Sequence, residues 1–324
     1  MTTTLSAPGL EEIEQYRTEL RGYCYRMLGS TFDADDAVQE TLVKAWQKSD
    51  SFEGRSSVRS WLYRIATNVC LDSLRARGRR ALPMDLSSPA SPLTPPDHTL
   101  PGSAWLEPVP DADVTPLSAD PALKAVFSDS IRLAFVAALQ TLPPKQRAVL
   151  ILREVLCWQA TEVAELLDTT VAGVNSALQR ARATLGAADL SNPAPLEQAD
   201  KELLARYVKA FEAYDISALV ALLHEDASIS MPPMAMWLQG VADLSAWYLG
   251  FGIGCKGSRL VPTVANGLPA FGQYRPDHDN GGHQAWSLQV LEITDGAVAH
   301  IHHFLDVEKL FPRFGLDLHI PTVT

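Results

Sequence analysis

Apolar residues recur every three or four positions through the first eighty residues, which is the spacing of half-buried helices. One such stripe covers 13–27 and a second covers 33–46, where Asp33 is placed to cap the helix. No glycine or proline interrupts 55–77. The pattern therefore predicts a third, longer helix there, capped by one of the serines at 56–57.

A second helical block follows later in the chain. A stripe over 134–142 ends at two prolines, and another helix begins directly after them. Residues 162–182 then read as two short helices joined by a turn at Asp168, with Thr170 capping the later one. This is the pattern of a helix-turn-helix. Its second helix turns three residues inward: Val171, Val174 and Leu178.

The last block mixes two periodicities. Helical stripes occupy 203–223. Residues 227–231 alternate before a proline pair, as an edge strand does, and 285–305 alternate on both sides of Asp295-Gly296, a strong hairpin signal. Helices followed by antiparallel strands predict an α+β domain.

Proline placement divides the chain of 324 residues, a length suited to two or three domains. Ten of the 22 prolines fall within 81–125, so we expect a stiffened linker there. The predicted division is one domain over 10–80, the linker over 81–125, a helix-turn-helix domain over 126–188 and a third domain over 197–320.

The net charge of the chain becomes informative only when it is counted for each predicted block separately. The formal net charge of −11 argues against nucleic acid for the chain taken whole. By block, however, 1–80 carries +1, the linker −5, 126–186 +1 and 187–324 −8. Seven arginines against one aspartate lie within 55–80, a density that suits phosphate contacts as well as a solvated helix face.

Composition excludes several other classes. No apolar run reaches the roughly 18–20 residues of a membrane span, and the first residues lack the order of a signal peptide. The four cysteines are too widely spaced for a zinc knuckle or a disulfide framework. We expect a cytoplasmic protein with no membrane association, no metal and no cofactor.

The first block carries a resemblance to a known family. Residues 33–46, read as DADDAVQETLVKAW after the initial stripe, resemble the polymerase-binding helix of bacterial sigma factors. Residues 52–54 (FEG) and 58–75 resemble their segment that melts promoter DNA and reads the minus-ten element. The match is to the extracytoplasmic-function group of the sigma-70 family.

This resemblance implies two sets of binding residues. The set implied to contact core polymerase is Asp33, Asp36, Gln39 and Glu40. Cationic side chains would hold the DNA backbone, and planar or amide groups would read extruded bases, although the spacing of Trp61 also suits core packing. The set implied for the minus-ten element is Arg55, Ser57, Arg59, Trp61, Arg64, Asn68, Asp72 and Arg75.

The second block resembles the minus-thirty-five-binding domain of the same family, through 142–147 (LPPKQR) and 178–182 (LQRAR). It departs from the family at Asp168, where glycine is usual, and at Gly173, Asn175 and Ala177, where Thr, Lys and Arg are frequent. Amide, hydroxyl and guanidinium groups suit base edges and phosphates. The residues expected to contact DNA are Thr170, Asn175, Ser176, Gln179, Arg180 and Arg182.

The third block resembles a SnoaL-like domain, in which a curved antiparallel sheet and helices form a cone with a pocket. On one strand His300 and His302 point to one side and His303 to the other. A ligand pocket, a vestigial pocket and histidines bonded within a sheet wall all remain open. The candidate pocket set is Trp237, Trp247, Trp286, His300 and His302.

Together these resemblances imply two all-α sigma domains, the second with a helix-turn-helix, plus an α+β domain. They predict a sigma factor, not an enzyme, that binds core RNA polymerase and promoter DNA. Its acidic C-terminal domain would contact the sigma domains and modulate them, with the loop 277–282 as a candidate contact or a plain turn and with an unknown small ligand as a further partner. The alternatives are a SnoaL-like hydrolase or cyclase fused to a DNA-binding module, and a repressor that binds duplex DNA alone.

Overall fold

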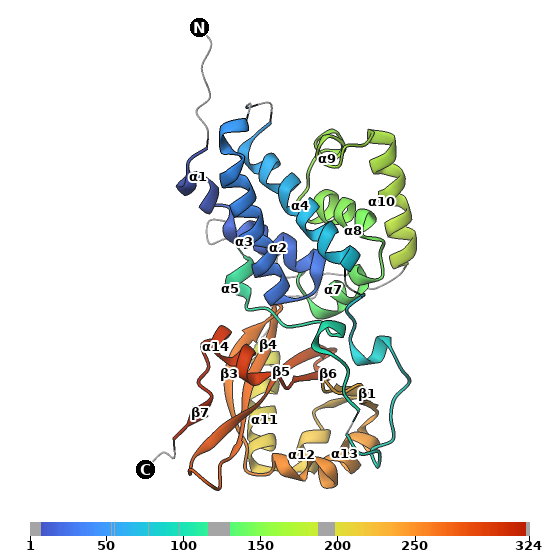
Figure 1. Cartoon of the computed structure of the whole chain (residues 1–324). Coiled ribbons are helices and arrows are strands. Elements are labelled where there is room, and N and C mark those ends of the chain that lie inside the picture. The colour runs from blue at the N-terminus through green and yellow to red at the C-terminus, as the bar shows by residue number, and fades with distance from the viewer. Residues whose placement is uncertain are drawn as a thin grey trace. The chain divides into compact units, whose positions relative to one another are not determined.

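The computed structural model describes residues 8–52, 54, 56–76, 78–96, 98–115, 130–186 and 198–321. The chain forms two compact units, each built from two separate stretches of sequence (Figure 1). The first contains Met1–Arg80 and Leu106–Ser191, and the second contains Ala81–Trp105 and Asn192–Thr324. The two helical blocks predicted as separate domains therefore share one unit.

The first stretch of unit 1 is a helical bundle of α1 (Leu10–Glu14), α2 (Arg17–Leu28), α3 (Thr31–Gln47) and α4 (Val58–Ala76), with a short turn η1 (Ser49–Ser51). The predicted stripe over 13–27 is broken at Tyr16, where α1 gives way to α2. Ser30 rather than Asp33 caps α3, because its hydroxyl accepts from the Asp33 amide at 3.1 Å.

The second stretch of unit 1 adds α5 (Asp111–Val114), α7 (Leu133–Gln140), α8 (Pro144–Leu150), a π turn η4 (Ile151–Val155), α9 (Ala160–Leu166) and α10 (Val171–Leu185). Helix α5 packs on α2, and the Glu107 amide donates to the Gly29 carbonyl at 3.0 Å. Helices α7 and α8 also contact α2, so the bundle and the helix-turn-helix share buried surface.

Unit 2 is an α+β domain. Its helices are α11 (Gln198–Ala213), α12 (Ile216–Val220), α13 (Val241–Leu249) and α14 (Val307–Arg313), with short turns η2 (Pro83–Asp85), η3 (Gly102–Ala104) and η5 (Phe251–Cys255). Its strands are β1 (Leu223–Ser230), β2 (Trp237–Gln239), β3 (Arg259–Ala265), β4 (Leu268–Pro276), β5 (His283–Thr294), β6 (Ala297–Phe304) and β7 (His319–Ile320).

The strands form one sheet in the order β2-β1-β6-β5-β4-β3, with β7 paired to β5. Only the β1–β6 pair is parallel, so the sheet is mainly antiparallel, as predicted. Strand β1 is not the predicted edge strand, because β2 lies outside it. The predicted hairpin is confirmed: Asp295 and Gly296 both have positive φ, as a type I′ turn requires.

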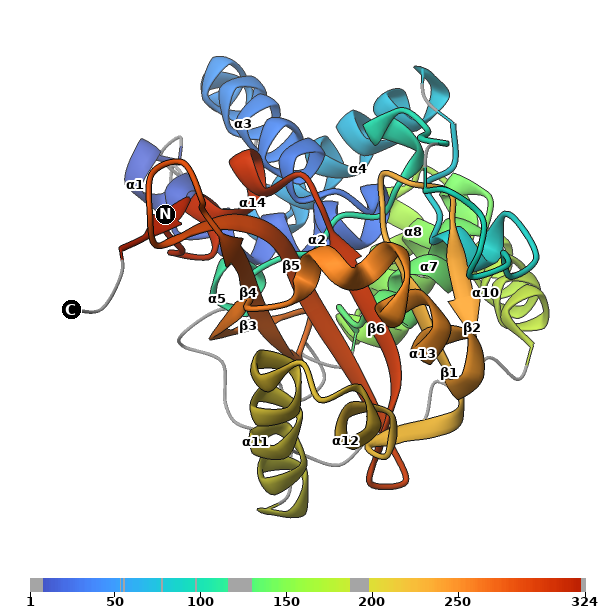
Figure 2. The same cartoon turned by 90° about the horizontal axis from the view of Figure 1, so that it is seen from below.

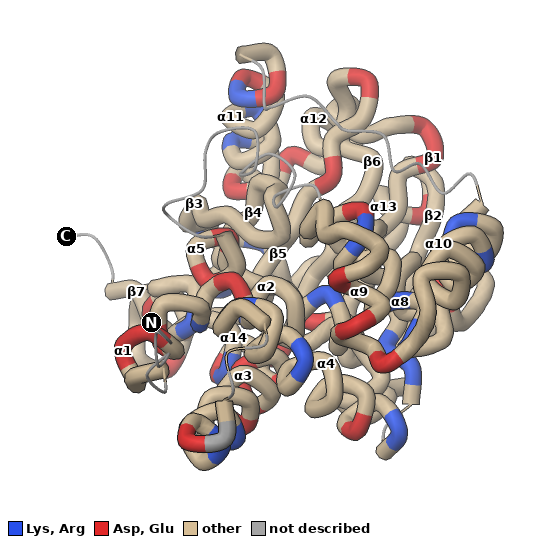
Figure 3. Tube along the Cα trace, turned by 90° about the horizontal axis from the view of Figure 1, so that it is seen from above, with Lys and Arg blue, Asp and Glu red and all other residues tan. Residues whose placement is uncertain are grey.

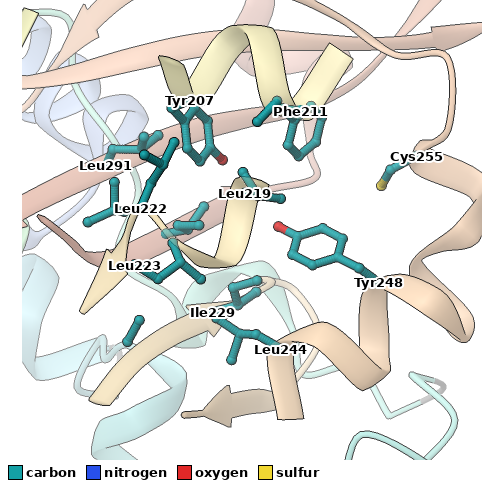
Figure 4. Packing of buried hydrophobic residues seen from close by; sticks show 14 of the residues in the cluster. Tyr207, Phe211, Leu219, Leu222, Leu223, Ile229, Leu244, Tyr248, Cys255 and Leu291 are labelled. Carbon is teal, nitrogen blue, oxygen red and sulfur yellow. The ribbon is translucent and has the colours of Figure 1, made fainter. Parts of the chain in front are cut away.

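Helices α11, α12 and α13 cover one face of the sheet (Figure 2). Tyr207 and Phe211 of α11 meet Leu291 and Ile229 from the strands in a buried apolar cluster (Figure 4). On the opposite face α14 packs against β5, and the absence of a side chain at Gly272 leaves room for it.

The predicted linker 81–125 does not behave as one segment. Residues 81–105 belong to unit 2 and 106–115 to unit 1, where Leu106, Val109 and Val114 are buried. Residues 116–125 lie outside the described part of the chain. The described part of this proline-rich segment, up to residue 115, is therefore divided between the two units rather than free of both.

Candidate nucleic-acid interface

Helix α3 exposes one mixed acidic and apolar face. Asp36, Gln39 and Glu40 are exposed there, as the sequence predicts. Val43 and Trp46 lie on the same face, and the Trp46 side chain is 60% exposed. Trp46 ends the apolar stripe that the sequence predicts over 33–46, but the seven-residue step from Gln39 places it among the exposed polar positions.

Asp33 is separated from the other three residues of the predicted polymerase-binding set. Its carboxylate accepts from the Arg80 guanidinium at 2.7 Å, and both side chains are largely buried. Glu107 lies 3.7 Å from the same guanidinium, and burial raises the pKa of the Glu107 carboxyl. This internal ion cluster also removes Arg80 from the basic stripe, because its charge is used within the fold.

Helix α4 presents a continuous polar face. Arg64, Asn68, Asp72 and Arg75 are all exposed at steps of three and four residues, so they line one side of the helix. Asp72 accepts from Arg75 at 2.7 Å. The row offers cationic groups for phosphate and an amide and a carboxylate for base edges.

The remaining predicted minus-ten residues have different surroundings. Ser57 is exposed, and its hydroxyl accepts from the Ser60 amide at 3.1 Å, as a helix cap does. Trp61 is half-buried and packs on Phe52 with ring centroids 5.1 Å apart. Arg55 lies outside the described residues.

Arg59 is not on the exposed face of α4. Its guanidinium donates to the Glu19 carboxylate and lies 5.1 Å from the centroid of the Trp158 ring. Burial disfavours the charge, but the hydrogen bond to Glu19, the attraction of its carboxylate and the contact with Tyr63 together raise the pKa of Arg59. Arg59 thus joins α2, α4 and the segment before α9, a role that requires tertiary contacts and that spacing alone does not reveal.

Further contacts join α4 to α9 and to the segment before α9. The Arg64 guanidinium donates to the Glu165 carbonyl of α9 at 2.9 Å, and the Tyr63 and Trp158 rings lie 5.0 Å apart. Deeper in the unit, buried Arg147 of α8 donates to the Met27 carbonyl at the end of α2. The N-terminal half of α4 therefore packs beside the helix-turn-helix.

The helix-turn-helix itself follows the prediction closely. Asp168 adopts the left-handed conformation, with φ of 54°, at the position where the family usually has glycine. Thr170 caps α10 by accepting from the Gly173 amide at 3.0 Å. Val174 and Leu178 are buried as expected, whereas Val171, the first residue of α10, is exposed.

The outward face of α10 carries all the predicted DNA-contact residues after the cap. The side chains of Asn175, Ser176, Gln179, Arg180 and Arg182 are exposed. Arg182 pairs with Glu154 at 2.7 Å on the surface. Figure 3 shows the cationic positions at the C-terminal half of α10 and the acidic positions on α3.

The predicted pocket set of unit 2 is not brought together. His300 and His302 lie on the sheet face opposite the cluster of α11–α13, where their Nδ1 atoms bond to Ser228 and Ser230 at 2.7 and 2.9 Å. His302 also lies 3.4 Å from Glu292. These two histidines are therefore bonded within the sheet wall, one of the alternatives that the sequence left open.

The three tryptophans of the predicted pocket set have different neighbours and do not line one pocket. Trp237 of β2 donates its indole N–H to the Ser87 carbonyl at 2.8 Å. Trp247 is buried against Gly252, where any side chain would collide with the indole. Trp286 is half-buried beneath the Arg275 guanidinium, which lies 3.2 Å from the ring centroid.

His303 faces the helix-covered side instead. It belongs to a buried polar chain in which Tyr207 donates to Gln289, Gln289 and Ser287 donate to Gln273, and Ser287 meets His303 Nδ1 at 3.1 Å. Because the Ser287 hydroxyl proton goes to Gln273, His303 Nδ1 is the donor to Ser287, and Nε2 is left as an acceptor.

Among the described residues, the buried polar atoms without a hydrogen-bond partner include three of this interior: His303 Nε2, Tyr248 Oη and Trp247 Nε1. Figure 4 shows the hydroxyls of Tyr207 and Tyr248 both pointing into the middle of the cluster. Burial lowers the pKa of His303 to about 3, so the ring is neutral. The sequence interpretation placed His303 on the side opposite His300 but did not include it in the pocket set.

The loop 277–282 is a turn that is held by its own hydrogen bonds and by β7, where His319 Nε2 lies 2.8 Å from the Gly281 carbonyl oxygen. The Asp277 carboxylate accepts from the amides of Asp279 and Asn280 at 3.0 Å, and Gly282 has positive φ at a site where a Cβ would lie 2.4 Å from the Ile320 carbonyl. Among the described residues no group of three or more His, Cys, Asp or Glu side chains is arranged to hold a metal ion. No helix in the described ranges combines the length and apolarity needed to cross a membrane.

Comparison with known proteins agrees with this architecture. Residues 13–80 match Sigma-70 region 2, 132–185 match Sigma-70 region 4 and 204–301 match the SnoaL-like domain. The ECF RNA polymerase sigma factor SigG of Mycobacterium tuberculosis is 47% identical over 311 residues, covering 94% of this chain and 82% of that protein.

A second relative extends the comparison to a solved structure. The ECF RNA polymerase sigma factor SigJ of the same organism is 26% identical over 311 residues, covering 93% of this chain and 92% of that protein. The crystal structure of SigJ shares the fold, with a TM-score of 0.62 at 23% identity over 95% of this chain and 100% of that chain. The chain therefore belongs to the extracytoplasmic-function sigma factors of RNA polymerase.

Proposed function

We propose that the exposed face of α3 binds core RNA polymerase and that α4 and α10 bind the minus-ten and minus-thirty-five promoter elements. The observation that carries this proposal is the uninterrupted polar row of Arg64, Asn68, Asp72 and Arg75 on α4, within the residues that match Sigma-70 region 2. The naming of the relatives as RNA polymerase sigma factors supports it. We place this action in the cytoplasm, where the polymerase works.

The polymerase surface we propose consists of Asp36, Gln39, Glu40 and Trp46 on α3. An exposed tryptophan among carboxylates offers a large apolar contact ringed by polar groups, which is the usual composition of an interface hot spot. Asp33 is not part of this surface, because Arg80 holds its carboxylate.

The chemistry of α4 suits strand opening. Extruding a base from the duplex costs a few kcal/mol, and capture of the free base on the protein returns about 1–3 kcal/mol per base. Asn68 offers both a donor and an acceptor to a base edge, and Arg64 and Arg75 offer charge to the backbone. Helix α10 suits duplex DNA, since Asn175 and Gln179 offer amides to the major groove.

Two full-length variants test whether α4 opens the strands and α10 binds the duplex. Asn68→Ala should reduce promoter opening about tenfold and leave recruitment to the duplex unchanged. Permanganate reactivity of the melted strand measures the opening. Gln179→Ala should weaken recruitment by about 1–3 kcal/mol, the worth of one amide–base pair. Lys48→Ala, an exposed change on neither DNA-facing helix, serves as the control. Equal effects of both variants on duplex binding without polymerase would instead support a repressor.

We propose that unit 2 regulates these surfaces rather than performing catalysis. It carries 8 Lys and Arg against 17 Asp and Glu, a net charge of −9, while unit 1 carries −2. An acidic domain is suited to guide or compete for cationic surfaces. His300 and His302 are occupied by the serines of β1, which supports a structural role for them over the hydrolase or cyclase alternative.

A small ligand of the unit 2 interior is a second proposal, which rests on the unpartnered Tyr248 Oη and His303 Nε2. A hydroxyl donor and an imidazole acceptor suit a ring compound that bears both a carbonyl and a hydroxyl group. Titration with para-hydroxyacetophenone should shift the Nε2 resonance of His303, and Tyr248→Phe should weaken that response. An unchanged spectrum at millimolar probe would contradict the proposal.

A further inference from the structure

Arg275 of β4 is a half-buried arginine without a carboxylate partner. Unit 2 carries 17 Asp and Glu, but within the described part of the chain none of them lies at ion-pair distance from this guanidinium. The acidic residue nearest in sequence, Asp277, instead accepts from the amides of Asp279 and Asn280. Withdrawing a guanidinium from water without an opposite charge is costly.

The contacts that Arg275 does make use little of its hydrogen-bonding capacity. Its Nη2 donates to Cys255 Sγ at 3.2 Å, and sulfur is a weak acceptor. Its Cζ lies 3.2 Å from the centroid of the Trp286 ring, a cation–π contact that leaves the N–H groups at the edge of the guanidinium unused. Its Nε is buried and has no partner. The arginine is therefore fixed in position while most of its donors stay unpaired among the described residues.

The 3-10 turn η5 packs against this guanidinium. Residues three apart share a face of a 3-10 helix, so Gly252 lies with Cys255, and Phe251 lies with Gly254. The face of Gly252 and Cys255 is buried, and Figure 4 shows the Cys255 sulfur pointing toward the apolar cluster. A Cβ at Gly254 would lie 3.3 Å from Arg275 Nη1, so the missing side chain there leaves room for the guanidinium.

An apolar surface adjoins this cation. Phe251 is 48% exposed on the face that it shares with Gly254, and its neighbour Ile253 is 53% exposed. Apolar side chains exposed close together mark binding surfaces more often than single ones do. Lys256, directly after η5, is exposed and adds a second positive charge. The site is thus cationic and apolar within a domain that is acidic as a whole.

We propose that unit 2 binds a small organic carboxylate with an apolar chain here, the carboxylate on Arg275 and the chain against Phe251. The planar guanidinium matches a carboxylate in geometry and charge, and the stack on Trp286 holds it ready. This inference goes beyond the proposed function, because the site requires neither DNA nor polymerase. It also uses atoms other than Tyr248 Oη and His303 Nε2.

The test is calorimetric titration of the full chain with octanoate, an eight-carbon carboxylate. Octanamide has the same chain without the charge, and it should bind at least about tenfold more weakly, because a hydrogen bond to a charged group is lost. Acetate has the charge without the chain, and it should also bind at least about tenfold more weakly, because several CH₂ groups stay in water.

Matched variants locate the site. Arg275→Gln should weaken octanoate binding at least about tenfold, whereas Arg259→Gln, on the neighbouring strand β3 and paired with Glu212, should not change it. Phe251→Ser should weaken octanoate binding severalfold, whereas Leu249→Ser, which removes an exposed side chain of α13, should not. If Arg275→Gln does not fold, the Phe251→Ser and octanamide arms decide, since both leave the arginine in place.

Four results would each overturn the proposal. They are no binding heat at millimolar octanoate, equal affinity for octanoate and octanamide, equal losses in Arg275→Gln and Arg259→Gln, and displacement of octanoate by a capped acidic peptide at a lower concentration than octanoate itself. The last result would assign the site to a protein partner. None of these measurements involves a promoter, so a failure here leaves the proposed function intact, and a failure of promoter opening leaves this inference intact.

Discussion

The pKa of His303 is set by the buried surroundings of its ring. Its ring lies among Ser287, Gln273 and the apolar cluster, and burial holds its pKa near 3. The alternation of β6 indicates its side of the strand, but not that this side is covered by helices, because the cover comes from α11–α13, some fifty or more residues earlier in the chain.

This burial predicts an acid-sensitive domain. The folded-state pKa is lowered from an unfolded value of about 6.5, so between pH 6.5 and pH 3 the unfolded chain binds the extra proton and stability falls as pH falls. From pH 7.5 to 5.5 the loss from this group is about 1.4 kcal/mol. Hydrogen exchange of the β5 and β6 amides measures it. His303→Gln should remove this part of the slope, and exposed His278→Gln should retain it.

The turn between α9 and α10 contains an aspartate in the left-handed conformation. Asp168 occupies a left-handed turn position that costs a non-glycine residue about 1 kcal/mol. Asp168→Gly should therefore stabilise the helix-turn-helix by up to about 1 kcal/mol, seen as a higher denaturant midpoint for α9 and α10 amides. Asp168→Ala at the same site should give no such gain. A larger gain from alanine than from glycine would contradict the backbone explanation.

Spacing rules locate elements better than they locate partners. They give α4 and α10 with their exposed polar faces, since a helix repeats every 3.6 residues whatever surrounds it. They do not give the Asp33–Arg80 pair or the Arg59–Glu19 pair, because each joins residues forty or more apart through tertiary packing. They do not show that residues 81–105 are hydrogen-bonded to unit 2 either, because a proline-rich composition looks the same whether the segment is free or bound.

Arg147 is a buried arginine that joins the two sigma regions, together with the contacts of Arg59 and Arg64. Arg147 is 3% exposed and donates to the carbonyls of Met27, Gln140 and Leu142. It also donates to the Gln140 side chain at 2.5 Å. Burial lowers its pKa to about 10, which leaves it charged at neutral pH.

Arg147→Lys should destabilise unit 1 by about 2–3 kcal/mol, because a single ammonium cannot serve carbonyls in several directions and leaves some of them buried without a donor. Thermal unfolding of the full chain measures the loss. Lys145→Ala, two residues away and exposed, is the matched control and should change little. Wild-type stability in Arg147→Lys would show that charge alone suffices there.

Ala81 and Trp105 form a parallel bridge, so the two ends of the segment 81–105 meet, and this has a consequence for engineering. A chain that leaves and re-enters a domain at one point can carry an inserted sequence between those points without stretching the scaffold. Leu93, at the exposed tip, is the natural insertion site for a fluorescent reporter domain. Such a fusion would report on the sigma factor from inside its own sequence, with both termini left untouched.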